Sequence, residues 1–308
     1  MSMFTNLPRE FFIPPKTEVI FVQDFFAKEL IGGAELTSDA IIKACPHKLF
    51  ELHSQSITEA MIQKHRDKLW VFGNQTQVAP HLLQMFIDLN IQYYFFEYDF
   101  KPCLMRSTKK HEMSQAGKCD CHNMLHGKFL AHWMTKARIL FWCSDGQRDK
   151  FYGLYPHLKG QTRDFTQSST FYPETILNIR KIRERKERGE IQVLDRWVIL
   201  DSDSWIKGTS DAVSYCKERN MNYVLLKNLT NEQFLEELAK SKGLVFFPRD
   251  MDVGSRISVE AKLLGGEVVL NDNVLPRFEP WFSRPLEEIE EYFLDGPSRF
   301  WRTIEKSL

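Results

Sequence analysis

Three acidic residues lie close together in one stretch of the second half of the chain. Asp250 and Asp252 follow the apolar run Gly-Leu-Val-Phe-Phe at 243–247, and Glu260 comes eight residues after the second aspartate. A short apolar run is typical of a buried strand, so the two aspartates fall just after its carboxyl end. In open α/β sheets, ligands bind at that edge. The acids are therefore candidates for ligand binding, although solvated acids in an ordinary strand–helix unit give the same pattern.

The neighbouring residues define the elements that would position these acids. A polar loop covers 249–255 and leads into a helical pattern. The apolar face of that helix consists of Ile257, Ala261 and Leu264. A glycine pair at 265–266 ends the helix, and the run at 267–270 is typical of the next buried strand. The stretch therefore predicts one strand–loop–helix–strand unit.

The spacing in this unit resembles the signature of the retaining GT-B nucleotide-sugar glycosyltransferases of the family 4-like group. That signature has a proline, an acid, a Glu-Ala pair, a glycine and a Val-Val strand, in this order. The matching residues are Pro248, Asp252, Glu260, Ala261, Gly265, Val268 and Val269. The family usually has Glu where this chain has Asp252. It also has glycines one and three residues later, where this chain has Val253 and Ser255.

The resemblance implies a fold and a set of binding roles. The fold would be α/β in the GT-B arrangement, where two Rossmann-like domains with parallel sheets face a cleft and the second domain holds most of the donor. Glu260 would bind ribose hydroxyls, and Asp252 would bind hydroxyls of the transferred sugar. The start of the helix after Gly254, at Ser255 and Arg256, would add backbone N–H donors.

A glycine pair near the amino terminus is a second candidate site. Gly32 and Gly33 follow a β-rich run at 18–22 and precede a helix predicted over 34–44. Glycine lets backbone approach a ligand closely, and a helix amino terminus favours an anion. A plain flexible turn has the same sequence, but the family commonly has Gly-Gly-Ala-Glu after its first strand. The resemblance therefore implies N–H donors at Gly32 and Gly33.

A lysine marks the corresponding position in the second half. Lys207 stands in a loop after a strand predicted at 197–200 and is followed by glycine. This pair resembles the family's Lys-Gly pair, whose lysine meets the donor diphosphate; an exposed structural lysine is the alternative. The family often has an arginine five residues earlier, where this chain has Ser202. Arg249 and Arg256 are the candidates to replace that charge.

These residue types suit glycosyl transfer. The reaction develops positive charge on the sugar and negative charge on the departing diphosphate, which Lys207 and helix amino termini would stabilise. The resemblance implies a hexosyltransferase-like enzyme that acts with retention and needs no catalytic metal, with Lys207 and Asp252 as catalytic residues. The donor would be a nucleoside-diphosphate sugar, and the acceptor a carbohydrate, a lipid or a protein. A non-catalytic GT-B-like scaffold or nucleotide-sugar-binding protein is the main alternative, and a nucleotide-sugar epimerase is another.

The segment 97–127 is rich in cysteine and histidine. The spacing C-x7-H-x7-C-x-C is formed by Cys103, His111, Cys119 and Cys121. Three thiolates and one imidazole can complete a tetrahedral zinc shell, and such a cross-link would hold a long polar insert in shape. The spacing therefore predicts a possible structural zinc site, and free thiols with surface histidines are the alternative.

Strands and helices alternate along the chain, which predicts parallel sheets with helices on their faces. We place an acceptor-side domain at 1–188, with the insert 97–127 inside it, and a nucleotide-sugar-binding domain at 189–308. The boundary follows a charged helix ending at 188. Its alternating charges indicate a solvated face rather than a nucleic-acid patch.

Two further expectations concern the cleft and the carboxyl end. Glu97 and Asp99 directly follow a strand predicted at 91–96, so they either face the cleft or lie exposed to solvent. The resemblance implies that the last helix returns to the first domain, with Phe300 and Trp301 as its anchors.

Composition bounds the class of protein. The 308 residues are 43% hydrophobic and 27% charged, which is enough apolar material for a core and excludes a disordered chain. A net charge of +0 gives no overall attraction to nucleic acid or anionic membrane. No apolar run approaches the ~20 residues that span a bilayer, and residues 1–12 lack a signal-peptide pattern. We therefore expect a cytoplasmic protein whose 6 cysteines are thiols or metal ligands.

Overall fold

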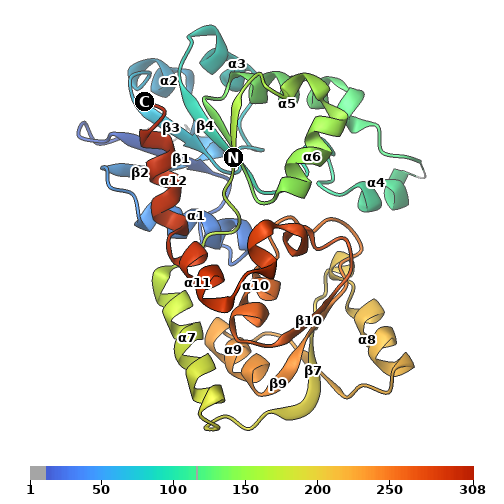
Figure 1. The fold of residues 1–308 in the computed structure, drawn as a ribbon. Coiled ribbons are helices and arrows are strands. Elements are labelled where there is room, and N and C mark those ends of the chain that lie inside the picture. Colours follow the sequence, from blue (N-terminus) through green and yellow to red (C-terminus); the bar gives the residue numbers. More distant parts are fainter. Residues whose placement is uncertain (1–11, 116) are drawn as a thin grey trace, which may run out of the picture.

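The computed structural model describes residues 12–115 and 117–308 of the chain. Almost all of the segment expected to lack a signal peptide therefore lies outside the described residues. The described residues form two sheets, one of six strands and one of four, and all strand pairs in them are parallel. Figure 1 shows the two sheets in separate halves of the molecule, each with helices packed around it. The predicted α/β class with two parallel sheets is confirmed.

The first sheet has the strand order β2-β1-β3-β4-β5-β6. Its strands are β1 (Val19–Gln23), β2 (Leu49–His53), β3 (Leu69–Phe72), β4 (Tyr93–Glu97), β5 (Ile139–Trp142) and β6 (Arg163–Thr166). Successive side chains of a strand point to opposite faces. Ile20 and Val22 accordingly lie in the core on one face, whereas Val19 and Phe21 lie in the core on the other. Both faces are buried, as expected for a parallel sheet.

Helices cover both faces of this sheet. The helices of this half are α1 (Gly33–Lys43), α2 (Glu59–Lys64), α3 (Pro80–Asp88), α4 (Thr108–Gln115), α5 (Leu125–Lys136) and α6 (Asp145–Leu154), of which α4 lies at the edge. Ser144 caps α6 by accepting a hydrogen bond from the backbone N–H of Gln147. The sequence Ser-Ile-Thr-Glu at 56–59 predicts a capping box with Ser56 as the cap of α2, but Thr58 is the cap in the structure. Ser56 instead ends a short 3₁₀ turn.

The second sheet has the strand order β10-β9-β7-β8. Its strands are β7 (Leu194–Leu200), β8 (Tyr223–Leu226), β9 (Ser241–Phe246) and β10 (Glu267–Leu270). The helices of this half and the carboxyl end are α7 (Pro173–Glu187), α8 (Thr209–Glu218), α9 (Asn231–Ala239), α10 (Arg256–Leu263), α11 (Leu286–Leu294) and α12 (Gly296–Glu305). The unit β9–α10–β10 is the one predicted around the acidic loop, and Gly265 adopts φ +67 just after its helix.

Two helices pack across the sequence division at 188. Helix α7 buries Ile176, Ile179 and Ile182 in the core of the second half, although it precedes residue 188. Helix α12 lies against the first half (Figure 1), where Phe300 and Trp301 join the core beside the first sheet. The Trp301 Nε1–H donates to the carbonyl of Ile41 at 2.8 Å. The chain therefore crosses between the halves before α7 and again before α12.

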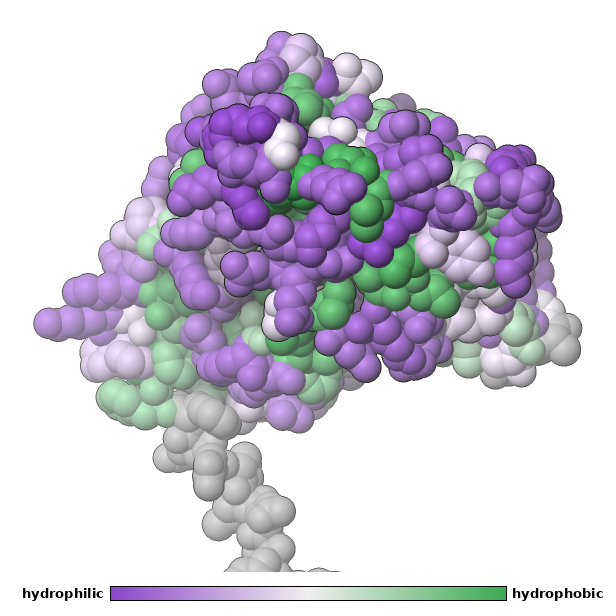
Figure 2. Space-filling model, turned by 90° about the horizontal axis from the view of Figure 1, so that it is seen from below, coloured by the Kyte–Doolittle hydropathy of each residue, from purple (hydrophilic) through white to green (hydrophobic). Residues whose placement is uncertain are grey.

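Among the described residues, no helix is both long enough and apolar enough to cross a bilayer. In the view from below, hydrophilic residues cover most of the surface and hydrophobic residues occur in smaller groups among them (Figure 2).

Candidate functional site in the cleft

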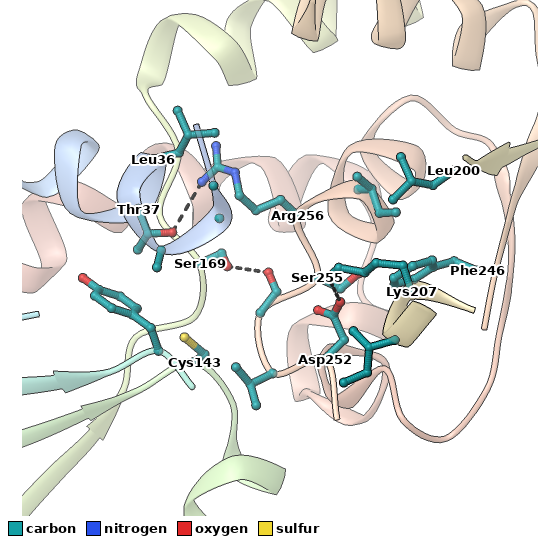
Figure 3. A pocket seen from close by; sticks show the side chains of 18 of the residues that line it. Leu36, Thr37, Cys143, Ser169, Leu200, Lys207, Phe246, Asp252, Ser255 and Arg256 are labelled. Atoms are coloured by element: carbon teal, nitrogen blue, oxygen red, sulfur yellow. Dashed lines mark hydrogen bonds and ion pairs between the residues drawn. The ribbon is translucent and has the colours of Figure 1, made fainter. Parts of the chain in front are cut away.

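A cavity of ≈ 590 Å³ lies between the two halves and is lined by residues of both. This volume is in the range of small-molecule binding sites. The predicted donor-site residues all line it: Gly32, Gly33, Lys207, Asp252, Gly254, Ser255, Arg256 and Glu260. In Figure 3 the side chains of Lys207, Asp252, Ser255 and Arg256 come from the second half, and Thr37 and Cys143 of the first half lie across from them. The structure thus brings together segments that are more than 200 residues apart in the sequence.

Two helices begin at the cavity without a side-chain cap. Helix α1 of the first half starts at Gly33, and helix α10 of the second half starts at Arg256. Their N-cap residues, Gly32 and Ser255, make no side-chain capping bond, and the buried Ser255 hydroxyl has no hydrogen-bond partner among the described residues. The first N–H groups of a helix need partners from outside it, and they favour an anion. Both helix ends favour a negatively charged group, and at the α1 end the buried carboxylate of Glu35, in the helix's own first turn, already lies beside Gly32.

Lys207 and Asp252 form an ion pair in the cavity. The Lys207 Nζ lies 2.8 Å from the Asp252 Oδ2 (Figure 3). The Asp252 carboxylate raises the pKa of Lys207, because the nearby negative charge favours the ammonium form. Lys207 is placed by the next residue, Gly208, whose φ of +66 makes the turn into α8. A Cβ at position 208 would lie 1.8 Å from the Phe247 carbonyl oxygen, so the turn requires glycine.

Glu260 lies buried on α10, at the wall of the cavity formed by the second half. Its Oε1 accepts a hydrogen bond from the Asn231 Nδ2 at 3.1 Å. Burial raises the pKa of Glu260, because removal from water disfavours the charged form. Apolar side chains, including Leu226 and Phe234, line the cavity on the same side as Asn231. This wall therefore offers a carboxyl group that can bind hydroxyls and, beside it, an apolar surface that can pack against a flat ring.

The two arginines considered as replacements for the charge missing at Ser202 have different surroundings. Arg249 makes two hydrogen bonds of 2.7 Å to Asp211 and does not line the cavity. Arg256 does line it, but its guanidinium donates to the Thr170 carbonyl at 2.5 Å and lies over the Phe171 ring at 3.9 Å. Burial lowers the pKa of Arg256. Arg249 is thus bound to Asp211 outside the cavity. Arg256 binds the segment before α7, where the chain crosses from the first half to the second.

The first half contributes residues that the sequence reasoning missed. Arg106 lines the cavity, and its guanidinium donates to Asp99 Oδ2 at 3.0 Å and to Thr76 Oγ1 at 2.7 Å. Asp99 lines the cavity too, which is the first of the two alternatives expected for Glu97 and Asp99. Glu97 does not: it is buried outside the lining and pairs with Lys101 at 2.8 Å. Nothing local in the sequence marks Arg106, because its partners come from distant loops.

Asp250 links the two halves at the rim of the cavity. Its Oδ2 accepts hydrogen bonds from the Ser107 hydroxyl at 2.6 Å and from the Lys109 backbone N–H at 3.1 Å. The sequence placed Asp250 at a sheet edge but gave no partner for it. The structure shows that it holds the amino-terminal turn of α4, in the cysteine-rich insert, against the second half.

The four predicted metal ligands also converge. The ligand atoms of Cys103, His111, Cys119 and Cys121 all lie within 4.8 Å of one another. The Cys121 Sγ is 3.4 Å from the His111 Nδ1. This cluster does not line the cleft cavity.

Comparisons with known proteins bear on the fold. No protein-family model and no curated protein matches the chain. Among solved structures, HepE from Anabaena in complex with UDP superposes with a TM-score of 0.56 and 11% identity, over 94% of this chain and 100% of that one. HepE with UDP and glucose gives a TM-score of 0.54 and 10% identity over the same shares. This chain has the GT-B fold. At such low identity the likeness concerns the GT-B architecture alone, and it confirms the fold implied by the signature around Asp252 and Glu260.

A third structure agrees with this assignment of fold. The amino-terminal domain of trehalose-6-phosphate phosphatase from Candida albicans has a TM-score of 0.50 and 9% identity, over 94% of this chain and 96% of that one. The GT-B fold therefore accounts for nearly the whole length of the chain, including both sheets and the cleft between them.

Proposed function

We propose that this GT-B protein is a glycosyltransferase that moves a sugar from a nucleoside-diphosphate sugar to an acceptor. The observation that carries the proposal is the convergence of two uncapped helix amino termini and Lys207 on one cavity. These groups supply positive potential where a diphosphate would bind. The HepE structures were obtained in complex with UDP and with UDP-glucose, so uridine nucleotides are the first donors to test.

The donor would bind along the wall of the cavity that the second half of the molecule forms. Glu260, which is held by Asn231, would accept hydrogen bonds from ribose hydroxyls, with the base against the apolar wall near Phe234. Lys207 would bind the diphosphate and Asp252 the hydroxyls of the transferred sugar. The N–H groups at Gly33 and Arg256 would bind phosphate oxygens from the two sides.

The proposed reaction breaks the bond between the sugar's anomeric carbon and the diphosphate oxygen. A bond forms between that carbon and the acceptor oxygen, and the acceptor proton passes to the departing diphosphate. Lys207 and the helix termini would stabilise the negative charge that develops on the leaving group. In other transferases a metal ion stabilises that charge. The proposal therefore requires no catalytic metal.

Retention of configuration belongs to the same proposal. An inverting transfer needs a protein base for the acceptor. Among the described residues the cavity is lined by no histidine, and its carboxylates are Asp99, Asp250, Asp252 and Glu260. Each carboxylate is held by a hydrogen-bond partner: Arg106, Ser107, Lys207 and Asn231 respectively. This favours a reaction in which the leaving group itself takes the proton, on the face that it leaves.

A scaffold that binds nucleotide sugars without turning them over is the second candidate. It is favoured by the serine at position 202 and by Arg249, which is bound to Asp211 rather than facing the cavity. The diphosphate site would then have Lys207 as its chief side-chain charge. The cavity wall formed by the first half, which includes Arg106, would then bind a partner other than an acceptor.

The test is release of nucleoside diphosphate from a panel of nucleotide sugars, beginning with UDP-glucose. We expect slow hydrolysis or transfer by the unaltered chain and at least about a tenfold loss in Lys207→Ala, since one transition-state contact of about 1.4 kcal/mol corresponds to that factor. Lys217→Ala, on the exposed side of α8, is the matched control. Binding of a nucleotide sugar without any turnover across the panel would instead support the scaffold.

A further inference from the structure

The cysteine-rich insert carries a second site, separate from the donor cavity. Its ligands come from three elements: Cys103 from the loop after β4, His111 from α4, and Cys119 and Cys121 from the segment before α5. Cys103 and Cys121 are buried, and the other two are half-buried. The four residues fall within one short segment of the chain, and none of them lies in a strand.

We propose that the cluster binds one zinc ion in a closed site made by three cysteine thiolates and one histidine. A tetrahedral zinc with Zn–S bonds of about 2.3 Å holds its sulfur ligands about 3.8 Å apart. The four ligand atoms already lie within 4.8 Å of one another, and one pair is at 3.4 Å, so only a small contraction is needed. Thiolates with one imidazole select zinc over hard cations such as magnesium. Four protein ligands leave no open position, so the ion is structural.

The local backbone is built to bring the ligands together. At Gly127, in the first turn of α5, an added Cβ would lie 2.5 Å from the Cys121 carbonyl oxygen and from the His122 Cα. Only glycine admits that close approach of the ligand-bearing turn to α5. The turn at Cys103 is closed by a hydrogen bond of 2.8 Å from the Arg106 N–H to the Cys103 carbonyl, with Arg106 at φ +53.

Helix α4 of the insert has little core packing of its own to hold it. Helix α4 (Thr108–Gln115) has no fully buried side chain among those described, and it is only 8 residues long. Isolated helices of that length are marginal in water, and helices in proteins gain their stability from packing an apolar face. Figure 1 shows α4 at the edge of its half, on the side that faces the second half. A metal bond to His111 replaces the missing core contact.

The zinc would fix one wall of the cleft. Arg106 and Ser107 lie directly between Cys103 and α4. Arg106 lines the donor cavity, and Ser107 bonds Asp250 of the second half at 2.6 Å. Holding Cys103 and His111 together thus positions both residues. The role proposed for the ion is to order the segment through which the insert reaches the other domain.

The first test measures zinc directly in the purified, unaltered chain. We expect about one zinc per chain, and replacement by cobalt should give the absorption bands of a tetrahedral thiolate site. Cys119→Ser should weaken retention of the metal at least about tenfold in a chelator competition. Cys45→Ser, at a half-buried free cysteine on α1's carboxyl side, should retain it. A metal-free chain in which Cys103, Cys119 and Cys121 are three reactive thiols under native conditions, or one with a disulfide between these cysteines, would overturn the proposal.

A second readout tests the positioning role and does not depend on a mutant that folds. Hydrogen exchange is followed in the unaltered chain before and after zinc is removed by a chelator. Exchange at the Lys109 amide, which donates to Asp250, should become faster, and exchange in α8 should not change. Equal protection of Lys109 with and without metal would show that the ion does not order this contact. Neither measurement uses a nucleotide, so the outcome is independent of the proposed transferase activity.

Discussion

The Lys207 ammonium nitrogen lies 2.8 Å from the Asp252 carboxylate, inside the cavity between the two domains. The resemblance gave these residues separate roles, with Lys207 on the diphosphate and Asp252 on the sugar. The structure joins them in one ion pair before any ligand binds. Asp252 therefore keeps Lys207 charged and in place, and the pair must be shared with or opened by an anionic ligand. Substitutions of the two residues should then have opposite effects on nucleotide binding.

We expect Lys207→Ala to weaken UDP binding by roughly 10- to 100-fold. A hydrogen bond to a charged group contributes about 1.5–3 kcal/mol, and 1.4 kcal/mol is a factor of ten. Isothermal titration calorimetry at low and high salt measures the change, with Lys217→Ala as a control of equal charge. An unchanged affinity in the Lys207 variant would place the diphosphate elsewhere.

We expect Asp252→Asn to bind UDP at least as tightly as the unaltered chain and to lose sugar transfer. The substitution removes a negative charge next to the proposed diphosphate site and releases Lys207 from its ion pair. It also removes a carboxylate that would hold the sugar. Titration with UDP and turnover of the nucleotide sugar are measured on the same sample. A fall in UDP affinity like that of Lys207→Ala would mean that the pair acts only by holding the lysine in place.

Gly208→Ala should destabilise the fold, by about 1–3 kcal/mol from backbone strain alone. The residue has φ +66, and an added Cβ would meet the Phe247 carbonyl oxygen at 1.8 Å. Gly153→Ala is the matched control: it lies in α6, where nothing is within 4 Å of the added atom, and alanine favours a helix by up to about 1 kcal/mol. Urea unfolding of the two variants should shift in opposite directions. A shift in the same direction would contradict the turn geometry.

The pH dependence of stability should change in Glu279→Gln. Glu279 is buried and accepts the Asp145 N–H at 2.7 Å, and burial raises its pKa from 4.5 to about 7. The folded state therefore binds this proton more tightly than the unfolded state does. Its contribution is present below pH 4.5 and is lost as pH rises to about 7. Glutamine can accept the same hydrogen bond without a charge.

Thermal unfolding at pH 5 and pH 8 measures this effect. The Glu279→Gln variant should gain melting temperature relative to the unaltered chain at pH 8 and show a smaller difference at pH 5. The same difference at both values would mean that Glu279 does not titrate in this interval.

The fold could be predicted where the sequence has local patterns. The apolar run before Asp250, the glycine pair at 265–266 and the strand after it specify β9–α10–β10 without tertiary information. Strand β6 (Arg163–Thr166) was missed because it is an edge strand with no buried residue, so it lacks the apolar run that marks the others. The packing of α7 on the core of the second half could not be predicted either. Charged residues separate its isoleucines, and only the tertiary structure shows which side of the helix faces solvent.

The candidate site could be predicted only in part, because some of its residues are brought to the cavity by tertiary contacts. Glycines and acids next to strands and helices can be read from spacing, and the structure brings them to one cavity. Arg106 could not be found, since it reaches the cavity through partners at Thr76 and Asp99. The commitment of Arg249 to Asp211 is equally a tertiary contact. The ion pair of Lys207 with Asp252 joins two loops 45 residues apart.

The measurement that tests the central claim most directly is a calorimetric titration of the unaltered chain and of Glu260→Ala with UDP. Glu267→Gln, at an exposed glutamate on β10, serves as the control. The account predicts that UDP binds the unaltered chain and the control with one site, raises their melting temperature, and binds Glu260→Ala at least about tenfold more weakly. Equal affinity in all three chains would contradict the placement of the nucleotide. No binding of UDP or of any other nucleoside diphosphate at millimolar concentration would contradict the glycosyltransferase proposal itself.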